Sequence, residues 1–186
     1  VIWTRLTRIP ELNREGPKFM VPSAEEHRKL DKMANPDSIY KAQIPEGFSL
    51  NEMEGACPGI KGEVKLLYYP FRSEDQKKET DWKPVDENKN FTRQWKLENL
   101  LPDKKYIVEI EARKPGKTKI TDKISGSFRT PPAPDTVKPL NFCIVTCHDY
   151  PRRDDSVNGH KIYRSMLQPF PDFLVHTGDV EYYDKP

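Results

Sequence analysis

Cysteine is scarce in this 186-residue sequence: there are three cysteines, a number that gives a poor disulfide framework. Two of them, Cys143 and Cys147, stand at the ends of the segment CIVTC, whose apolar run predicts a strand. At ~3.3 Å per residue their Cα atoms would lie ~13 Å apart, beyond the ~7 Å limit for a disulfide. The sequence therefore predicts no disulfide between these two residues and leaves the redox compartment open.

The sequence also lacks a membrane span and a marked excess of either charge. No run approaches the ~20 apolar residues that a transmembrane helix needs. Lysine and arginine number 31 against 29 aspartates and glutamates, so the formal net charge is only +2. This balance gives no electrostatic signature of nucleic-acid binding. The sequence begins at Val1 and shows no signal peptide, so it gives no direct indication of location.

Glycines are few, nine in all, whereas prolines number eighteen and cluster in RTPPAPDTVKPL, residues 129–140. The sequence pattern changes across this proline-rich segment, from short alternating runs to continuous apolar runs. We therefore expect a first domain over residues 1–135 and a second over residues 136–186.

The first domain has the pattern of a β-sandwich. Several of its segments alternate apolar and polar residues or are otherwise typical of strands, with turn signals between them. These segments are VIWTRLT, EVKLLYYPF, FTRQWKL, YIVEIEA and ISGSFRT. The alternation places Phe91, Trp95 and Leu97 on one face of a strand, and Tyr106, Val108, Ile110 and Ala112 on one face of another.

One corner of this domain has a recognisable spacing. In LLPDKKY, the spacing of Leu100, Pro102 and Tyr106 is similar to the tyrosine corner of fibronectin type III and immunoglobulin-like modules. In those modules the tyrosine hydroxyl bonds to nearby backbone. We therefore expect Tyr106 to be buried, with its hydroxyl bonded to nearby backbone.

Residues 8–60 interrupt the strand pattern. The segment PSAEEHRKLDKM predicts a short helix in which Ser23 and Glu26 are spaced as a capping box. The remainder is loop-like and too long for a hairpin connection, so we interpret residues 8–60 as an insertion in the sandwich. His27 and Cys57 lie in this insertion and are interpreted as structural or incidental.

The second domain begins as a strand–helix–strand unit. LNFCIVTC and DFLVHTG are apolar runs typical of strands buried on both faces, and their connection predicts that they are parallel. The intervening helix is expected to carry Ile162, Met166 and Leu167 on one face, with Asn158 as its cap. Two strands and one helix cannot bury a core alone, so we expect further polypeptide to complete this domain.

Polar residues follow both of these strands. The first strand ends in TCHD, which contains Cys147 and His148, and the second ends in GDVEYYD, which contains Asp179 and Tyr182. Ligands of open parallel sheets bind beyond the carboxyl ends of the strands. Because adjacent parallel strands bring these ends together, we expect the two clusters to lie within metal-bridging distance.

These motifs carry a resemblance to a known family. GDVEYYD fits the Gly-Asp-x-x-Tyr motif of metallophosphoesterases related to purple acid phosphatases. Together with VIWTRLT and LNFCIVTCHDY, it resembles the alkaline phosphatase D (PhoD-like) family, in which a fibronectin-like domain precedes the metallophosphoesterase domain. The resemblance covers the start of the chain, the sandwich strands and nearly everything after residue 138, but not the insertion.

The resemblance implies an enzyme. It implies hydrolysis of phosphate mono- or diesters through a metal-bound hydroxide, outside the cytoplasm, in a secreted, periplasmic or cell-surface protein. It also implies that Cys147, Asp179 and Tyr182 are metal ligands. A thiolate and a phenolate together suit Fe(III), because a free tyrosine ionises only near pH ~10, and Asp179 can bridge to a harder cation, which the family implies is Ca²⁺. The family's other ligands, from later strands, have no counterpart in the sequence, so we expect this chain alone to be incomplete.

Other interpretations of the same residues stay open. Cys147 could be an inert buried thiol, and Asp179 could simply cap the following turn. His148, if the strand continues, points to the opposite side and could contact substrate or support a ligand. Arg152 and Arg153 could hold a substrate phosphate or form a solvated charged turn.

The remaining candidates have plainer interpretations. Tyr183 is expected to pack, and His160 and His176 to be structural. At the level of the whole chain, the alternative to an enzyme is a non-catalytic β-sandwich that binds a partner, with Asp179 and Tyr182 merely structural.

Overall fold

The computed structural model of this chain describes residues 1–21, 23–30, 32, 41–149, 152–180 and 182. The chain forms two compact units, Val1–Pro131 and Pro132–Pro186. Pro22, Tyr183 and the side chain of His27 lie outside the described part.

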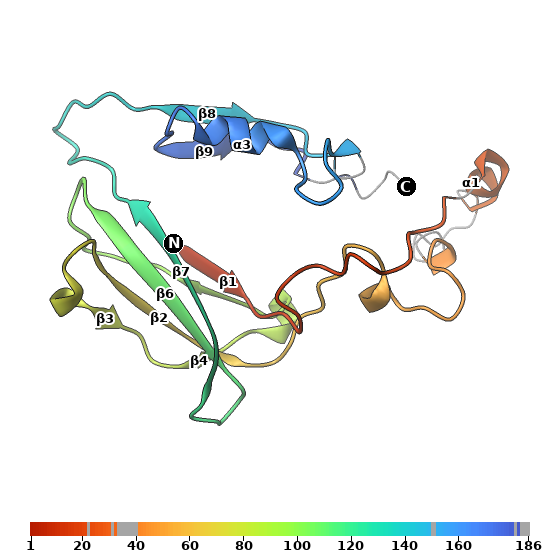
Figure 1. Cartoon of the computed structure of the whole chain (residues 1–186), viewed down its shortest axis with the longest axis horizontal. Helices are drawn as coiled ribbons and strands as arrows, with labels where there is room; N and C mark the ends of the chain where they lie inside the picture. Colours follow the sequence, from red (N-terminus) through yellow and green to blue (C-terminus); the bar gives the residue numbers. More distant parts are fainter. Residues whose placement is uncertain (22, 31, 33–40, 150–151, 181, 183–186) are drawn as a thin grey trace. The chain divides into compact units, whose positions relative to one another are not determined.

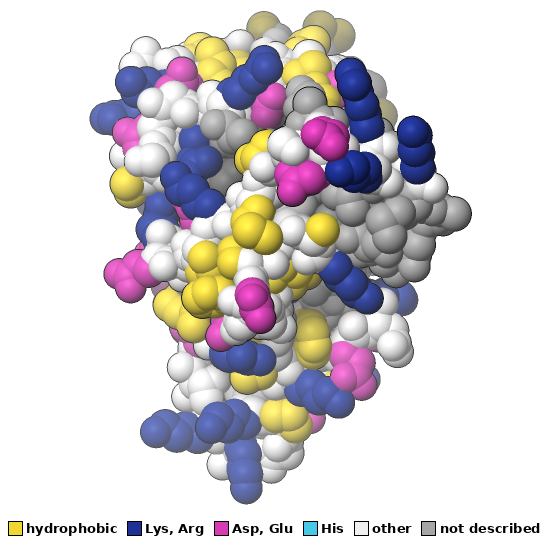
Figure 2. All heavy atoms as spheres, turned by 90° about the vertical axis from the view of Figure 1, so that its right-hand side faces the viewer, with side chains coloured by type: hydrophobic (Ala, Val, Ile, Leu, Met, Phe, Trp, Pro, Cys, Tyr) yellow, Lys and Arg dark blue, Asp and Glu magenta, His cyan; other side chains and the backbone are white. Residues whose placement is uncertain are grey.

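Within the described part, no helix has the length and apolar character needed to cross a membrane. Figure 2 shows one face of the molecule, on which lysine and arginine side chains are interspersed with acidic and apolar ones.

The first unit contains two sheets (Figure 1). In the smaller sheet, β1 (Ile2–Arg5) pairs antiparallel with β5 (Thr92–Trp95). The larger sheet has the order β3-β2-β6-β7, and β4 also pairs with β2. Its strands are β2 (Glu63–Pro70), β3 (Lys78–Glu79), β4 (Lys83–Pro84), β6 (Lys105–Arg113) and β7 (Ile120–Arg129). Short 3-10 helices lie at η1 (Leu50–Glu52), η2 (Glu74–Gln76) and η3 (Glu87–Lys89).

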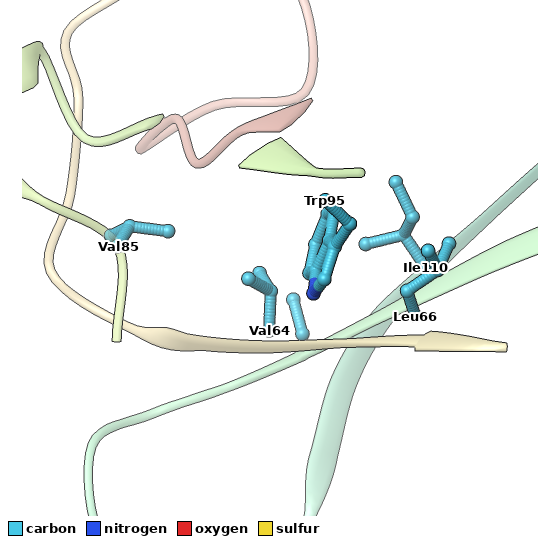
Figure 3. Close-up of a cluster of buried hydrophobic side chains, with 6 residues drawn as sticks. Val64, Leu66, Val85, Trp95 and Ile110 are labelled. Atoms are coloured by element: carbon cyan, nitrogen blue, oxygen red, sulfur yellow. The ribbon is translucent and has the colours of Figure 1, made fainter. Parts of the chain in front are cut away.

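The core lies between these two sheets. Trp95 of β5 points toward Val64 and Leu66 of β2 and Ile110 of β6 (Figure 3). The same cluster includes Ala112, and further apolar side chains pack against it: Ile2, Leu6, Tyr68, Phe91, Leu97 and Val108. The alternation of apolar residues along β5 and β6 thus predicted the core face correctly, because successive side chains of a strand point to opposite faces of its sheet.

Tyr106 occupies the predicted corner. Only 5% of its surface is exposed, and its hydroxyl accepts a hydrogen bond of 3.0 Å from the backbone N–H of Leu101. Its ring also stacks on Phe128 of β7, with ring centroids 5.6 Å apart. The prediction of a buried, backbone-bonded Tyr106 is confirmed.

The segment predicted as an insertion folds back on itself. Backbone hydrogen bonds join Arg8 to Pro58 and Asn13 to Ala56, and the side chain of Met53 is fully buried. A Cβ at Gly16 would collide with the backbone of Glu52 and Met53, so only glycine fits this close approach.

The predicted helix in this segment is α1 (Ala24–Leu30). The Ser23 hydroxyl accepts from the Glu26 N–H at 3.3 Å, and the Glu26 carboxylate accepts from the Ser23 N–H at 2.9 Å. This reciprocal pair is the predicted capping box. The bonds from Ser23 also hold the pKa of Glu26 below its usual value.

The second unit contains β8 (Phe142–Val145), α3 (Lys161–Leu167) and β9 (Phe173–His176). β8 and β9 pair in parallel, in a register that runs from Phe142 opposite Phe173 to Val145 opposite His176. The expectation that both strands are buried on both faces is wrong for this structure. Phe142, Ile144 and Phe173 are each at least 45% exposed, because the described elements of this unit are too few to cover both faces of the pair.

The details of α3 differ from the sequence prediction. Ile162 and Leu167 are 50% and 68% exposed, whereas Tyr163 and Met166, three residues apart, form the more buried face. The N-cap position is His160 and not Asn158, whose backbone N–H instead bonds to Asp155 in the preceding turn. A carboxylate upstream, that of Asp154, accepts from the N–H of Lys161 and so satisfies the start of the helix.

Candidate metal centre

The candidate site forms where the chain leaves the carboxyl ends of β8 and β9. The backbone pairing continues past both strands: the N–H of Cys147 donates to Gly178 at 3.2 Å, and that of His148 to Asp179 at 2.8 Å. Cys147 and Asp179 both have left-handed backbone, with φ of 62° and 51°. Since the chain turns at these two residues, neither strand continues, and the alternation of side chains along each strand ends there.

Three of the predicted side chains come together at this edge. The Cys147 Sγ lies 3.5 Å from Oδ2 of Asp179, and the Tyr182 hydroxyl donates to the same oxygen at 2.8 Å. Cys147 and Asp179 are exposed and Tyr182 is half-buried. The Cys147 thiol is therefore not buried in this structure, and its role as a ligand stays a prediction.

Three groups that can each lose a proton lie together in this cluster: the Cys147 thiol, the Asp179 carboxyl and the Tyr182 phenol. Hydrogen bonds to Cys147 and Asp179, and the negative charge of Asp179, raise the pKa of Tyr182 well above its usual range. Ionisation of the phenol would bring a second negative charge beside the carboxylate. A cation among the three groups would reverse this effect, because an opposite charge favours the ionised form.

The donor set fits a metal with affinity for sulfur and phenolate oxygen. The described residues contain no group of three His, Cys, Asp or Glu side chains placed to hold a metal ion. Here Cys147 and Asp179 supply two donors, and Tyr182 supplies the third. A thiolate and a phenolate suit a strongly acidic transition-metal ion, and a carboxylate oxygen suits a harder cation.

His148 lies on the side of this edge nearest α3. Its Nδ1 is 3.2 Å from the carbonyl oxygen of Val180, and its ring meets the rings of His160 and Tyr163 edge-on, with centroids 4.7 Å and 5.7 Å away. The predicted direction of His148 applied only if the strand continued to residue 148, and β8 ends at Val145. The sequence did not predict that Tyr163 and His160 lie near the site. Their place at the start of α3, the helix that follows the loop carrying Cys147 and His148, is the sequence feature that could have indicated it.

His176 is bonded within its own turn. Its Nδ1 accepts from the N–H of Gly178 at 3.4 Å. Since Gly178 immediately precedes Asp179, this bond helps to shape the turn that carries the carboxylate.

The two predicted arginines make local contacts. Arg152 Nε lies 3.5 Å from the Asp149 carboxylate, and Arg153 Nε donates to the carbonyl of Ser156 at 3.4 Å. The Arg152 side chain is 81% exposed, so its pairing with Asp149 contributes little to stability. Phosphate binding by either arginine stays a prediction.

Among solved structures, the described fold is similar to one titled "Structure of PhoD". The TM-score is 0.51 at 18% sequence identity, and the match covers 67% of this chain. The fold resembles that of PhoD. This chain spans 22% of the length of the PhoD chain, so the similarity concerns one part of a longer protein. No protein-family model matches the sequence, and no curated protein matches it. At this identity the likeness shows similarity of fold alone.

Proposed function

We propose that this chain is the N-terminal portion of a PhoD-like, metal-dependent phosphoesterase. Cys147, Asp179 and Tyr182 are its metal ligands. The observation that carries the proposal is the placement of the Cys147 thiol and the Tyr182 hydroxyl against one carboxylate oxygen of Asp179. Its position beyond the carboxyl ends of two parallel strands and the similarity of fold to PhoD support the same conclusion.

Each ligand has a separate role. Cys147 and Tyr182 would hold Fe(III) as thiolate and phenolate, and Asp179, whose Oδ2 lies near both, would supply a carboxylate oxygen for a second, harder cation, Ca²⁺. When bound, such a metal pair binds phosphate oxygens, activates water and stabilises the leaving oxygen. The chain itself holds the donors at fixed spacing and keeps them accessible, since Cys147 and Asp179 are exposed.

The proposal extends to substrate and location. The substrates are phosphate mono- or diesters, and the enzyme is secreted, periplasmic or attached to the cell surface. The ligands that complete the centre come from the rest of the catalytic domain, which acts together with this chain.

Absorption spectroscopy of purified residues 1–186 with added Fe(III) tests the ligand set. A phenolate bound to Fe(III) produces visible charge-transfer absorption, to which a bound thiolate also contributes. The absorption is therefore expected in the wild-type chain and is expected to lose its phenolate part in Tyr182→Phe. Tyr68→Phe, a change in the sandwich, is the matched control and should keep the band. Absorption left unchanged by Tyr182→Phe would exclude Tyr182 as a ligand. Absence of the band from the wild-type chain would favour a β-sandwich module that binds a partner without catalysis.

A further inference from the structure

The two loops that carry the proposed ligands are joined by His148 as well as by backbone pairing. The loop after β8 carries Cys147, and the loop after β9 carries Asp179. The backbone N–H of His148 donates to the carbonyl of Asp179, and its ring nitrogen Nδ1 lies 3.2 Å from the carbonyl of Val180. One residue thus contacts two consecutive carbonyls of the opposite loop.

The polarity of the second contact follows from chemistry. A carbonyl oxygen can only accept a hydrogen bond, so Nδ1 of His148 carries the proton and donates it to Val180. This bond spans from residue 148 to residue 180, across the same gap that separates the Cys147 Sγ from the Asp179 carboxylate.

The ring of His148 is also held from the helix side. His160, at the N-cap of α3, and Tyr163, in its first turn, both meet the ring edge-on. These two rings lie near each other as well, with centroids 6.4 Å apart. The imidazole therefore connects three segments: the loop after β8, the loop after β9 and the start of α3.

We propose that His148 is a positioning residue: its Nδ1–H bond to Val180 holds the two loops together, so that Cys147 and Asp179 stay within reach of one cation. The proposal rests on the proposed function for the cation, whereas the joining of the loops is a property of the chain itself. Groups that orient metal ligands typically change metal affinity by about 10- to 100-fold when they are removed.

Two substitutions separate the bond from the packing of the ring. His148→Phe keeps an aromatic ring beside His160 and Tyr163 but removes the donor. His148→Asn loses the ring but places an amide N–H near the position of Nδ1. If the bond matters, the Asn variant should behave like the wild-type chain and the Phe variant should not.

Hydrogen exchange of the metal-free chain, followed by NMR, measures the joining directly. The amides of Cys147 and His148 donate across the gap between the loops, so their protection reports how often the loops separate. Loss of one hydrogen bond should lower this protection about fivefold in His148→Phe. His148→Asn should retain it. Wild-type protection in the Phe variant, or an equal loss in both variants, would overturn the proposal, the latter because it would assign the effect to the ring.

Iron binding by the same variants tests the consequence for the site. His148→Phe should weaken Fe(III) binding about tenfold, as measured by titration of the charge-transfer band, and His148→Asn should bind as the wild-type chain does. Affinity unchanged in the Phe variant would show that the bond does not position the ligands. If the wild-type chain shows no band, the proposed function fails, and the exchange measurement still decides whether His148 joins the loops.

Discussion

Ile110 of β6 and Ile124 of β7 are direct cross-strand partners, yet Ile110 is 8% exposed and Ile124 is 56% exposed. Partners in an antiparallel pair project from the same face of the sheet, so both face the side on which the core lies. The smaller sheet has only β1 and β5 among the described strands, and it covers β2 and β6. β7 is exposed along almost its whole length, so the apolar face of the larger sheet extends beyond the core.

This difference predicts unequal effects of the same substitution. Ile110→Ala should lower the free energy of unfolding by ~2–5 kcal/mol, because it opens a cavity in the core. Ile124→Ala should change it by less than ~0.5 kcal/mol, as for other surface positions. Urea unfolding followed by the fluorescence of Trp95, which lies in the same cluster as Ile110, measures both. Equal effects would show that β7 is covered in solution.

Removal of the Tyr106 hydroxyl should destabilise the sandwich. In Tyr106→Phe the backbone N–H of Leu101 loses its partner, and an unsatisfied, partly buried donor costs ~1–3 kcal/mol. Tyr69→Phe is the control, because its hydroxyl lies 3.5 Å from Glu109, at the limit of a hydrogen bond, and its loss should cost less. Thermal unfolding compares the two variants; a larger loss for Tyr69→Phe would contradict the assigned role of Tyr106.

The charged face of the larger sheet predicts a pH dependence. Desolvation acts to raise the pKa of Glu109, but hydrogen bonds and charges from Lys123 and Lys77 outweigh it and lower the pKa below its ordinary value of 4.5. A lowered pKa in the folded state means that the ionised carboxylate stabilises the fold above about pH 4.5 and that this contribution is lost as pH falls through the folded-state pKa.

Lys123→Gln should therefore reduce stability slightly at pH 7, and by progressively less below about pH 4.5, because a solvent-exposed lysine pairs only weakly with its carboxylate. Lys119→Gln is a matched control on an exposed lysine for which the described residues show no ion pair. The measurement is urea unfolding at several pH values. A deficit in Lys123→Gln that stays constant down to pH 3 would mean that the pairing with Glu109 does not contribute.

The purified chain should show no phosphatase turnover by itself. Its three proposed ligands occupy part of one metal centre, and catalysis also needs ligands that fix the other cation and leave a position for water. The assay uses p-nitrophenyl phosphate and a bis-ester with residues 1–186, iron and calcium. Turnover above buffer that disappears in Asp179→Asn would show instead that these residues suffice.

The sequence predicted features that depend on local pattern. The core face of β6, the capping box at Ser23 and the corner at Tyr106 each follow from residues close together in the chain, and the structure contains all three. The proximity of Cys147 and Asp179 was predicted from the parallel pairing of two strands, because the carboxyl ends of adjacent parallel strands lie at the same edge of the sheet.

The failures depend on contacts that no local pattern encodes. Asparagine is a common N-cap residue, but the backbone N–H of Asn158 donates to the Asp155 carboxylate, and α3 begins only after His160. The direction of His148 depends on the left-handed turn at Cys147, a conformation that few non-glycine residues adopt and that no residue type in this segment predicts. Exposure of β8 and β9 depends on what else packs against them.

The left-handed turns at Cys147 and Asp179 imply a conflict between stability and chemistry at this edge. A non-glycine residue in this conformation costs about 1–2 kcal/mol, less for aspartate, whose side chain tolerates it better. Selection for stability alone would favour glycine at position 147, which adopts positive φ without steric penalty. Cys147→Gly should therefore leave the melting temperature unchanged or higher while iron binding is lost, so a thermostability screen of this protein would tend to discard the very residue that its chemistry requires.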